Sequence, residues 1–344
     1  MHTIAIVILN WNGSQMLRTY LPTVIGWSSD NPVYVADNGS TDNSLAMLAA
    51  EFPKVRVIPL DRNYGFAEGY NRALARVDAK YAVLLNSDVQ VTPYWLDHLL
   101  AYLESHPRVA ACQPKICSMD RLDDFEYAGA AGGFLDRFGY PYCRGRIFGT
   151  VETDEGQYDQ DVPVLWASGA ALCIRLDVYR EVGGLDGRFF AHMEEIDLCW
   201  RLWTRGYGVA CVTRSRVFHV GGGTLHKENP QKTYLNFRNN LLMLFKNLPD
   251  GKLRKVMAVR YVLDRLAALH FLLSGQAANA RAVMRARRDF RKLRTEFAAS
   301  RAENLEHAAR CGTAAPLSRL CILWQYYVRG RHKYSQLPKG KEKR

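Results

Sequence analysis

The chain of 344 residues lacks any hydrophobic run long enough to span a membrane. A span needs roughly 18 or more nearly uncharged apolar residues. The best candidate, residues 267–280, is shorter and contains His270, Gln276 and Asn279. A signal peptide is also missing, because the apolar run at residues 4–9 has no basic segment before it. We therefore expect a cytoplasmic protein that does not cross a bilayer.

The sequence also lacks the motifs of several cofactor and metal sites. None of its eight cysteines has the C-x-x-C spacing of a zinc site, and Cys173 and Cys211 lie in apolar runs typical of a core. Such scattered cysteines favour a reducing compartment. No G-x-G-x-x-G follows the first expected strand, which disfavours a dehydrogenase. That strand is followed by Asn-Trp-Asn-Gly-Ser with no basic residue before Arg18, which disfavours the basic triphosphate loop of a nucleotidyltransferase.

Acidic residues are scarce only in the last third of the chain. The whole sequence has 46 Lys and Arg against 34 Asp and Glu. Residues 230–344 have a net charge of +18 and residues 1–229 a net charge of −6. A basic region is attracted to anionic lipid, nucleic acid or polyanionic substrates, although it can also be a solvated helical face.

Strand and helix patterns alternate over about the first 90 residues. Apolar runs predict strands at residues 3–9, 33–36, 55–59 and 81–85, and helical patterns lie at 14–25, 45–52 and 69–77. This βαβαβαβ order predicts an α/β fold with a mostly parallel, doubly wound sheet and helices on both faces.

The rest of the chain divides into a mixed part and a helical part. Residues 113–164 are glycine-rich and expected to be irregular, followed by a strand at 165–174, a helix at 194–205 and short strands at 209–212 and 217–220. From residue 232 on the pattern is helical, with basic amphipathic helices at 254–273 and 281–305.

Polar residues follow three of the expected strands, at residues 10–12, 37–39 and 86–88. Ligands bind beyond the carboxyl ends of parallel strands, so these clusters predict one common site. Asp37 can accept hydrogen bonds from a ribose or a pyrimidine, or it can form a turn. Asp88 suits a hard divalent cation that bridges phosphates, although an Asn-Ser-Asp segment is also a common turn. His219 can be a metal ligand or a structural histidine.

Three further acids, Glu194, Glu195 and Asp197, begin the helix expected at 194–205. Crowded carboxylates raise the pKa of one member, which suits a general base. The same acids would also complement the dipole at the start of a helix.

These motifs occur in a fixed order. Ile-Val-Ile-Leu-Asn-Trp-Asn, Val-Ala-Asp-Asn-Gly-Ser-Thr-Asp, Asn-Tyr-Gly-Phe-Ala-Glu-Gly-Tyr-Asn (63–71) and Leu-Leu-Asn-Ser-Asp come first. They are followed by Ser-Gly-Ala-Ala, Gly-Gly-Leu-Asp-Gly-Arg-Phe-Phe, Glu-Glu-Ile-Asp-Leu-Cys-Trp-Arg and Phe-His-Val-Gly-Gly-Gly-Thr. The set covers about two thirds of the chain and resembles the inverting family 2 glycosyltransferases, most of all bacterial rhamnosyltransferase-type members that build surface polysaccharides.

The resemblance implies a GT-A fold and a nucleotide-sugar donor. It implies a catalytic domain over residues 1–229, with a nucleotide-sugar-binding half (1–112) and a metal and acceptor half (113–229), and a basic helical region over 230–344. The residues implied to bind the nucleotide-sugar are Asn10, Asn12, Asp37, Asn38, Asn63, Gly65, Asn71, Asn86 and Ser87. Asp88 and His219 would hold Mg²⁺ or Mn²⁺.

Glu195 would be the catalytic base, at a position where the family has Asp. Glu194 and Asp197, on the acceptor side, are the alternatives to it.

The resemblance further implies a glycan or polyprenyl-diphosphate-linked acceptor. We expect the basic helices to dock on the inner face of the membrane through Phe237, Leu241, Phe245, Tyr261 and Phe271. Nucleic-acid binding by the basic region is the competing interpretation, but it leaves the carboxylates at the strand ends without a role, so no nucleic-acid partner is expected.

Overall fold

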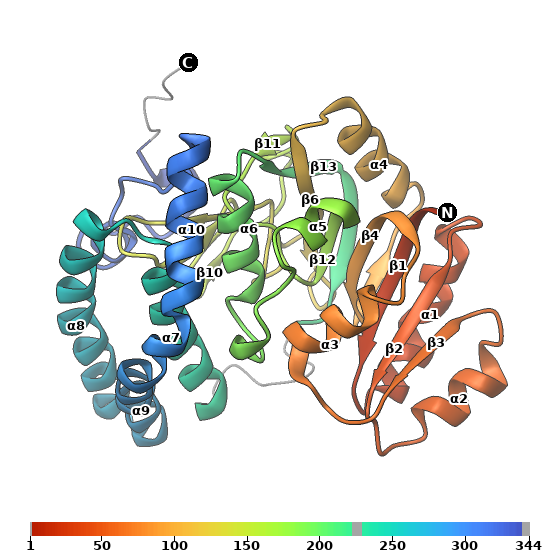
Figure 1. Cartoon of the computed structure of the whole chain (residues 1–344), viewed down its shortest axis with the longest axis horizontal. Helices are drawn as coiled ribbons and strands as arrows, with labels where there is room; N and C mark the ends of the chain where they lie inside the picture. The colour runs from red at the N-terminus through yellow and green to blue at the C-terminus, as the bar shows by residue number, and fades with distance from the viewer. Residues whose placement is uncertain (1, 222–228, 339–344) are drawn as a thin grey trace.

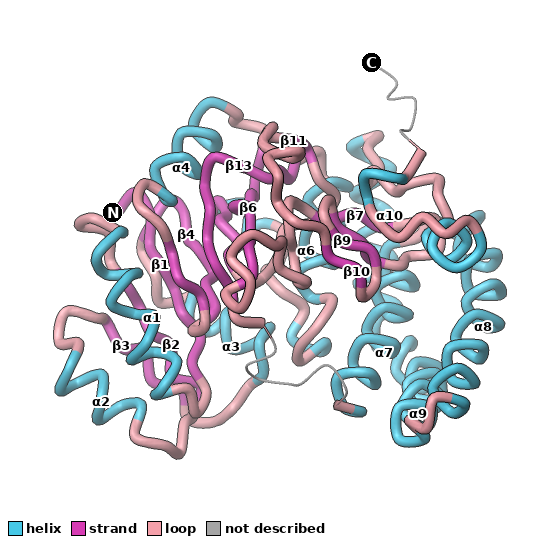
Figure 2. Tube along the Cα trace, turned by 180° about the vertical axis from the view of Figure 1, so that it is seen from behind, coloured by secondary structure: helices cyan, strands magenta, loops and turns pink. Residues whose placement is uncertain are grey.

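The computed structural model describes residues 2–221 and 229–338. Its main sheet has the strand order β11–β13–β6–β12–β4–β1–β2–β3, with β5 beside β13 (Figures 1 and 2). Strands β1 to β4 pair in parallel, as do β6 and β13, whereas β12 runs antiparallel between β4 and β6. The strands are β1 (His2–Asn10), β2 (Val33–Asn38), β3 (Arg56–Leu60), β4 (Ala79–Asn86), β5 (Val89–Val91), β6 (Val109–Ser118), β11 (Val162–Pro163), β12 (Ala171–Arg175) and β13 (Gly208–His219). The predicted mostly parallel sheet is confirmed.

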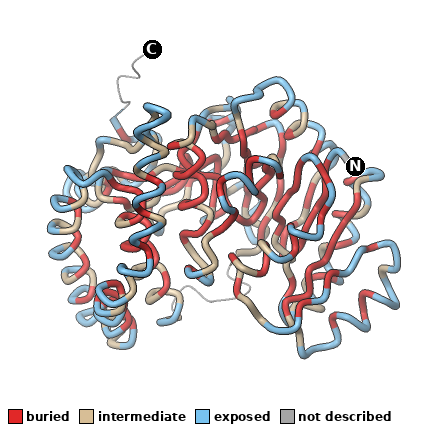
Figure 3. Tube along the Cα trace, in the orientation of Figure 1, coloured by how far each residue is buried: buried red, intermediate tan, exposed pale blue. Residues whose placement is uncertain are grey.

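Helices cover both faces of this sheet, because its strands are apolar on both sides. Along β1, Ile4, Ile6 and Ile8 point to one face and Ala5 and Val7 to the other, and all five are buried. The isoleucines pack with α1 (Ser14–Trp27), α2 (Ser44–Glu51) and α4 (Trp95–Ser105). The opposite face packs with α3 (Gly65–Leu74), α5 (Leu176–Glu181) and α6 (Glu194–Thr204). Figure 3 shows this buried centre between exposed outer helix faces.

The expectation of an irregular segment at residues 113–164 is wrong. The main-sheet strand β6 extends to Ser118, and a second, four-stranded sheet follows, formed by β7 (Gly133–Leu135), β8 (Pro141–Cys143), β9 (Arg146–Ile147) and β10 (Thr150–Val151). Strands of two or three residues are too short to show an alternating pattern in a sequence. The two short strands expected at 209–212 and 217–220 form the single strand β13, whose pairing with β6 shifts between Val212 and Arg216.

The C-terminal region is helical, as predicted, and packs on the body at the end opposite β3 (Figure 1). It contains α7 (Pro230–Asn247), α8 (Asp250–Leu273), α9 (Ala277–Leu293) and α10 (Ala298–Cys311), followed by a π-helical turn (Trp324–Val328) and a 3₁₀ turn (Tyr334–Gln336). The single helix expected at 281–305 is interrupted by a 3₁₀ turn at Arg294–Phe297, which brings Phe297 into the core beside Phe189 (ring centroids 5.7 Å apart). The domain boundary at residue 229 stays a prediction.

Part of the predicted membrane-docking set is wrong. Leu241 is fully buried, and Phe245 packs against Phe290, with ring centroids 6.3 Å apart. Both side chains attach α7 to the body instead of facing outward. Within the described ranges, no helix combines the length and the hydropathy that a bilayer crossing needs. The eight cysteines are free, and six of them are buried core residues.

Candidate active site

The side chains at the carboxyl ends of β1 and β2 form one hydrogen-bonded group. Asn10 lies opposite Asp37 in the parallel register, and its Nδ2 donates to Asp37 Oδ1 (3.1 Å) and Ser40 Oγ (3.2 Å). The other oxygen of Asp37 accepts the backbone N–H of Ser40 (3.0 Å), so this segment does form a turn. Asn12 Oδ1 accepts the N–H of Thr41 (2.7 Å). The turn therefore fixes Asp37 at the strand end, and Asn10 Oδ1 stays buried without a hydrogen-bond partner in the described residues.

Asn38 and Asn63 hold the loop that enters α3. Asn38 Nδ2 donates to Asn63 Oδ1 (3.2 Å) and to the carbonyl of Gly65 (3.0 Å), and Asn63 Oδ1 accepts the N–H of Gly65 (2.8 Å). The N–H of Phe66, in the first turn of α3, donates to the carbonyl of Phe190 (2.7 Å). Segment 63–71 is thus tied to β2 on one side and to the loop before α6 on the other.

Gly65 is required at this junction. It has a φ of +74°, and a Cβ there would lie 2.5 Å from a ring carbon of Phe190 and 2.7 Å from its backbone oxygen. We expect Gly65→Ala to lower the free energy of unfolding by about 2–4 kcal/mol, since it combines backbone strain with overpacking. Chemical denaturation measures the change.

Gly26→Ala is the matched control, because Gly26 lies within α1 and a Cβ there meets nothing within 4 Å. We expect it to leave stability unchanged or raise it by up to ~1 kcal/mol. Equal effects of the two alanines would contradict the close approach of Phe190 to Gly65.

Asn71 joins α3 to the segment after α5 by hydrogen bonds. Its Oδ1 accepts from the hydroxyl of Tyr179 (2.6 Å) and the N–H of Leu185 (3.1 Å), and its Nδ2 donates to the Leu185 carbonyl (2.8 Å). These bonds join α3 to the turn after α5. Asn71 therefore helps to position α3.

Asp88 and His219 meet at the carboxyl ends of β4 and β13. His219 Nε2 lies 3.2 Å from Asp88 Oδ1 and 3.3 Å from Asn86 Nδ2. On the other side of the ring, His219 Nδ1 lies 3.5 Å from Glu126 Oε2. No sequence motif singles out Glu126, because it lies in the glycine-rich segment that was expected to be irregular. The structure makes it the group that faces the second nitrogen of His219.

This cluster is buried and charged. Burial alone would lower the pKa of His219, but hydrogen bonds to Asp88 and Glu126 and the charges of both carboxylates raise it to about 10. Burial would raise the pKa of Asp88, and the bond to His219 outweighs this and lowers it. The imidazole therefore lies between two carboxylates, at a point where positive charge is stabilised.

The pair fits a divalent cation that a substrate helps to hold. Two ligand atoms that each lie about 2.1 Å from one cation are roughly 3 Å apart, which matches the spacing of Asp88 Oδ1 and His219 Nε2. The described residues contain no group of three or more His, Cys, Asp or Glu side chains that could hold a metal by themselves. Mg²⁺ is commonly bound by one or two carboxylates plus substrate phosphates, so two protein ligands are sufficient here. The glycines expected to follow His219 include Gly222 and Gly223, which lie outside the described residues.

The three acids at the start of α6 have different environments. Asp197 is fully buried, and its oxygens accept from Arg201 Nε (2.9 Å), Lys246 Nζ (2.8 Å) and Asn247 Nδ2 (2.8 Å). Burial would raise the pKa of Asp197, but Lys246 and Arg201 lower it. This carboxylate joins α6 to α7 and is a poor proton acceptor.

Glu194 and Glu195 differ in their access to solvent. Glu194 is buried, and burial together with the charge of Glu195 raises its pKa well above the usual value. Glu195 is half-buried, and burial raises its pKa to about 7. Neither Oε2 atom has a hydrogen-bond partner within the described ranges. Glu195 is therefore the more exposed residue of the two and has a pKa near neutrality.

The loop before α6 is strained and braced from the C-terminal region. Phe190, His192 and Met193 all have positive φ (67°, 71° and 75°). Asn239 of α7 donates to the carbonyls of Phe189 (3.0 Å) and His192 (2.7 Å). Sequence reasoning missed this role of Asn239, since no local pattern relates it to a loop 47 residues earlier. These hydrogen bonds from Asn239 fix the start of α6, and with it the position of Glu195.

Two glycines show that these groups share one region. A Cβ on Gly13 would lie 2.6 Å from Asn10 Oδ1 and 3.7 Å from Ser87 Oγ, so the end of β1 adjoins the Asn-Ser-Asp segment. A Cβ on Gly169 would lie 3.8 Å from the Cβ of Glu195. The next residue, Ala170, accepts the backbone N–H of Asn86 (3.0 Å). Glu195 thus lies beside the same strand end that presents Asp88.

Comparison with known proteins gives this arrangement a context. Residues 5–152 match the model of Glycosyl transferase family 2. An N-acetylglucosaminyl-diphospho-decaprenol L-rhamnosyltransferase of Mycobacterium tuberculosis is 30% identical over 234 residues, which cover 62% of this chain and 75% of that protein.

Solved glycosyltransferase structures share the fold. GalNAc-T7 in complex with UDP, GalNAc and Mn²⁺ aligns with a TM-score of 0.58 and 16% identity, over 73% of this chain and 49% of that one. A fragment of S. aureus TarS in complex with UDP-GlcNAc aligns with a TM-score of 0.55 and 13% identity, over 90% of this chain and 92% of the fragment. The GT-A fold implied by the sequence motifs is confirmed.

Proposed function

This chain belongs to glycosyltransferase family 2, in its rhamnosyltransferase-like branch, and from that premise we propose that it transfers L-rhamnose from a nucleoside-diphosphate donor to a polyprenyl-diphosphate-linked glycan, with inversion at the anomeric carbon. The observation that supports the proposal is that the Asp88–His219 pair and Glu195 both lie near the end of β4. The Asp88–His219 pair suits a cation that binds the diphosphate of a donor. Glu195 suits the hydroxyl of an acceptor. The proposed setting is the assembly of a cell-surface polysaccharide.

The donor would lie across the ends of β1, β2 and β4. Asp37, held by Asn10 and Ser40, is placed to accept hydrogen bonds from the nucleoside. The buried Oδ1 of Asn10 has no hydrogen-bond partner in the described residues and can accept from a ligand donor group. Asn38 and Asn63 act on the donor through the loop that they hold. The charge of the diphosphate would face Asp88 and His219.

We propose that Asp88 and His219 hold Mg²⁺ or Mn²⁺ together with the donor phosphates. Such a cation, when bound, neutralises charge that develops on the leaving diphosphate. Glu126 keeps His219 oriented, so that Nε2 points to Asp88.

Glu195 is the proposed base. Its carboxylate accepts the proton of the acceptor hydroxyl while the hydroxyl oxygen attacks the anomeric carbon from the face opposite the leaving diphosphate. A pKa of about 7 leaves a large fraction ionised at neutral pH and still gives a carboxylate that takes protons readily. Asp197 has a lowered pKa and positions α6, and Glu194 is buried.

A donor screen tests the proposal. We expect purified protein with Mn²⁺ to be stabilised against heat by one nucleoside diphosphate-sugar, with dTDP-L-rhamnose tested against UDP- and GDP-sugars. Diphosphate release with a synthetic polyprenyl-diphosphate-linked glycan measures turnover. Stabilisation by none of the donors would reject a transferase, whereas a different donor sugar would reject only the rhamnose assignment.

A further inference from the structure

In helix α8 the usual burial of a surface helix is reversed: charged side chains face inward and apolar side chains face outward. Its most buried positions include Arg260 and Asp264, whereas a run of large apolar residues faces outward. These are Val262, Leu266, Leu269 and Leu273, at i, i+4, i+7 and i+11, and they are 49–79% exposed. This spacing forms one stripe along the helix. Figures 1 and 2 both place α8 at the outer edge of the molecule, and Figure 3 shows its exposed outer side.

A buried charge network attaches the inner side of α8. Arg260 Nε donates to Asp264 Oδ1 (3.1 Å), Arg287 of α9 binds the other oxygen of Asp264, and Arg260 also donates to the carbonyl of Phe138 (3.1 Å). Together with Leu253, Val256 and Met257, which pack on the core, this network holds the helix without the four outer residues. The outer stripe therefore has no packing role within the described residues.

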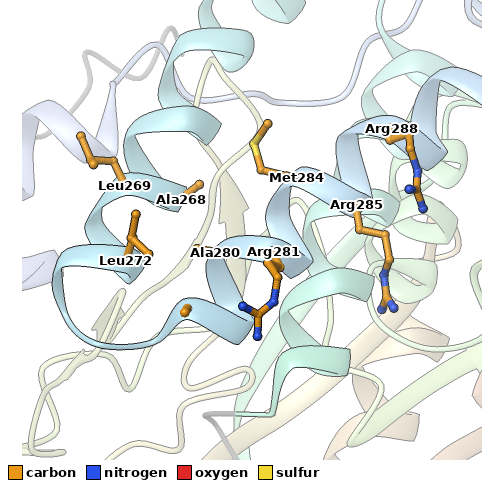
Figure 4. A pocket seen from close by; sticks show the side chains of 9 residues that line it. Ala268, Leu269, Leu272, Ala280, Arg281, Met284, Arg285 and Arg288 are labelled. Carbon is orange, nitrogen blue, oxygen red and sulfur yellow. The ribbon is translucent and has the colours of Figure 1, made fainter.

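A groove of about 640 Å³ lies between α8 and α9, beside this stripe. Its α8 side is apolar, with Ala268, Leu269 and Leu272, and its α9 side presents Met284 and three arginines. Figure 4 shows the guanidinium groups of Arg281, Arg285 and Arg288 extending from one side of α9, away from Met284. Arg288 pairs with Asp289 (3.1 Å), and Arg285 donates to Gln231 Oε1 (2.9 Å). Among the described residues, Arg281 and Arg285 have no carboxylate partner. An apolar surface bordered by exposed arginines suits a ligand with acyl chains and anionic headgroups.

We infer that the α8 stripe and the arginines of α9 dock on the surface of an anionic lipid bilayer. Residues 250–293 contain eleven Lys and Arg against three Asp, so an anionic surface complements them. A second copy of the chain would bring the same positive charge to the interface and is disfavoured by repulsion. The inference rests on the proposed function in one respect: a polyprenyl-linked acceptor is reached from the membrane surface.

Vesicle co-sedimentation of the full chain tests this inference without donor or acceptor. We expect binding to phosphatidylcholine–phosphatidylglycerol vesicles, little binding to phosphatidylcholine alone, and loss of binding at high salt. Leu266→Gln with Leu269→Gln and Leu273→Gln should weaken binding by roughly tenfold or more. Arg281→Gln with Arg285→Gln should weaken it by about tenfold and reduce its salt dependence.

The matched controls change exposed residues of the same types on other faces. Leu122→Gln replaces a leucine that is as exposed as Leu266, and Lys54→Gln with Arg108→Gln removes two charges. Both should bind vesicles like the unchanged protein. Wild-type-like binding by the α8 and α9 variants would overturn the inference, as would a dimer in sedimentation equilibrium that the leucine variants dissociate. Donor-induced thermal stabilisation, measured on the same variants, reports separately on the proposed function.

Discussion

Glu195→Gln should lower kcat by on the order of 10²–10⁴-fold, because it removes the group that accepts the acceptor proton. The amide keeps the size of the side chain but cannot take a proton, so donor binding should stay within about twofold of the unchanged protein. Steady-state kinetics with saturating donor measures kcat, and thermal shift with the donor measures binding. The effect is large since Glu195 is the half-buried acid of its cluster with a pKa near 7.

The pH profile gives the same prediction a second readout. A base must be deprotonated to act, so kcat/KM should fall about tenfold per pH unit below pH 7 and level off above it. Glu195→Gln should abolish this slope. Glu194→Gln is the neighbouring control, and we expect it to retain the slope with at most about a tenfold loss of rate. If instead Glu194→Gln were the inactive variant, the assignment of the base to Glu195 would be wrong.

The fold of the N-terminal half follows from local patterns. Continuous apolar runs such as residues 3–9 mark strands that are buried on both faces, and helices with an apolar stripe alternate with them. Such patterns are strong because each strand contributes to both core layers. The second sheet escaped prediction, because its strands are two or three residues long and depend on contacts with distant segments, such as the stacking of Phe134 on Tyr334 (ring centroids 5.9 Å apart).

The proximity of the candidate residues was predictable where they follow a strand directly. Asn10, Asp37 and Asp88 follow apolar runs, and the rule that ligands bind at such ends brings them together. Glu126 and Asn239 follow no such run. Their roles arise from pairings across 93 and 47 residues, which only the folded chain shows. The inverted burial of α8 was hidden for a related reason: the sequence shows apolar residues all around that helix but not which side a buried Arg–Asp pair occupies.

Asp88→Asn should remove the cation-dependent part of donor binding and lower kcat/KM by on the order of 10³-fold, since a cation at a leaving diphosphate contributes several kcal/mol to catalysis. Titration of Mn²⁺ in the presence of a nucleoside diphosphate, followed by the loss of the free-ion EPR signal, measures the affinity directly.

His219→Gln should have a comparable effect, because Asp88 and His219 are the two proposed protein ligands. Glu126→Gln should weaken Mn²⁺ by only about 10–100-fold, as expected of a group that orients a ligand without being one. Glu51→Gln, an exposed acid on α2, is the control and should bind Mn²⁺ normally. Undiminished Mn²⁺ affinity in Asp88→Asn would show that Asp88 is not a ligand of the cation. Glu126, the other carboxylate beside His219, would then be the remaining candidate for the carboxylate ligand.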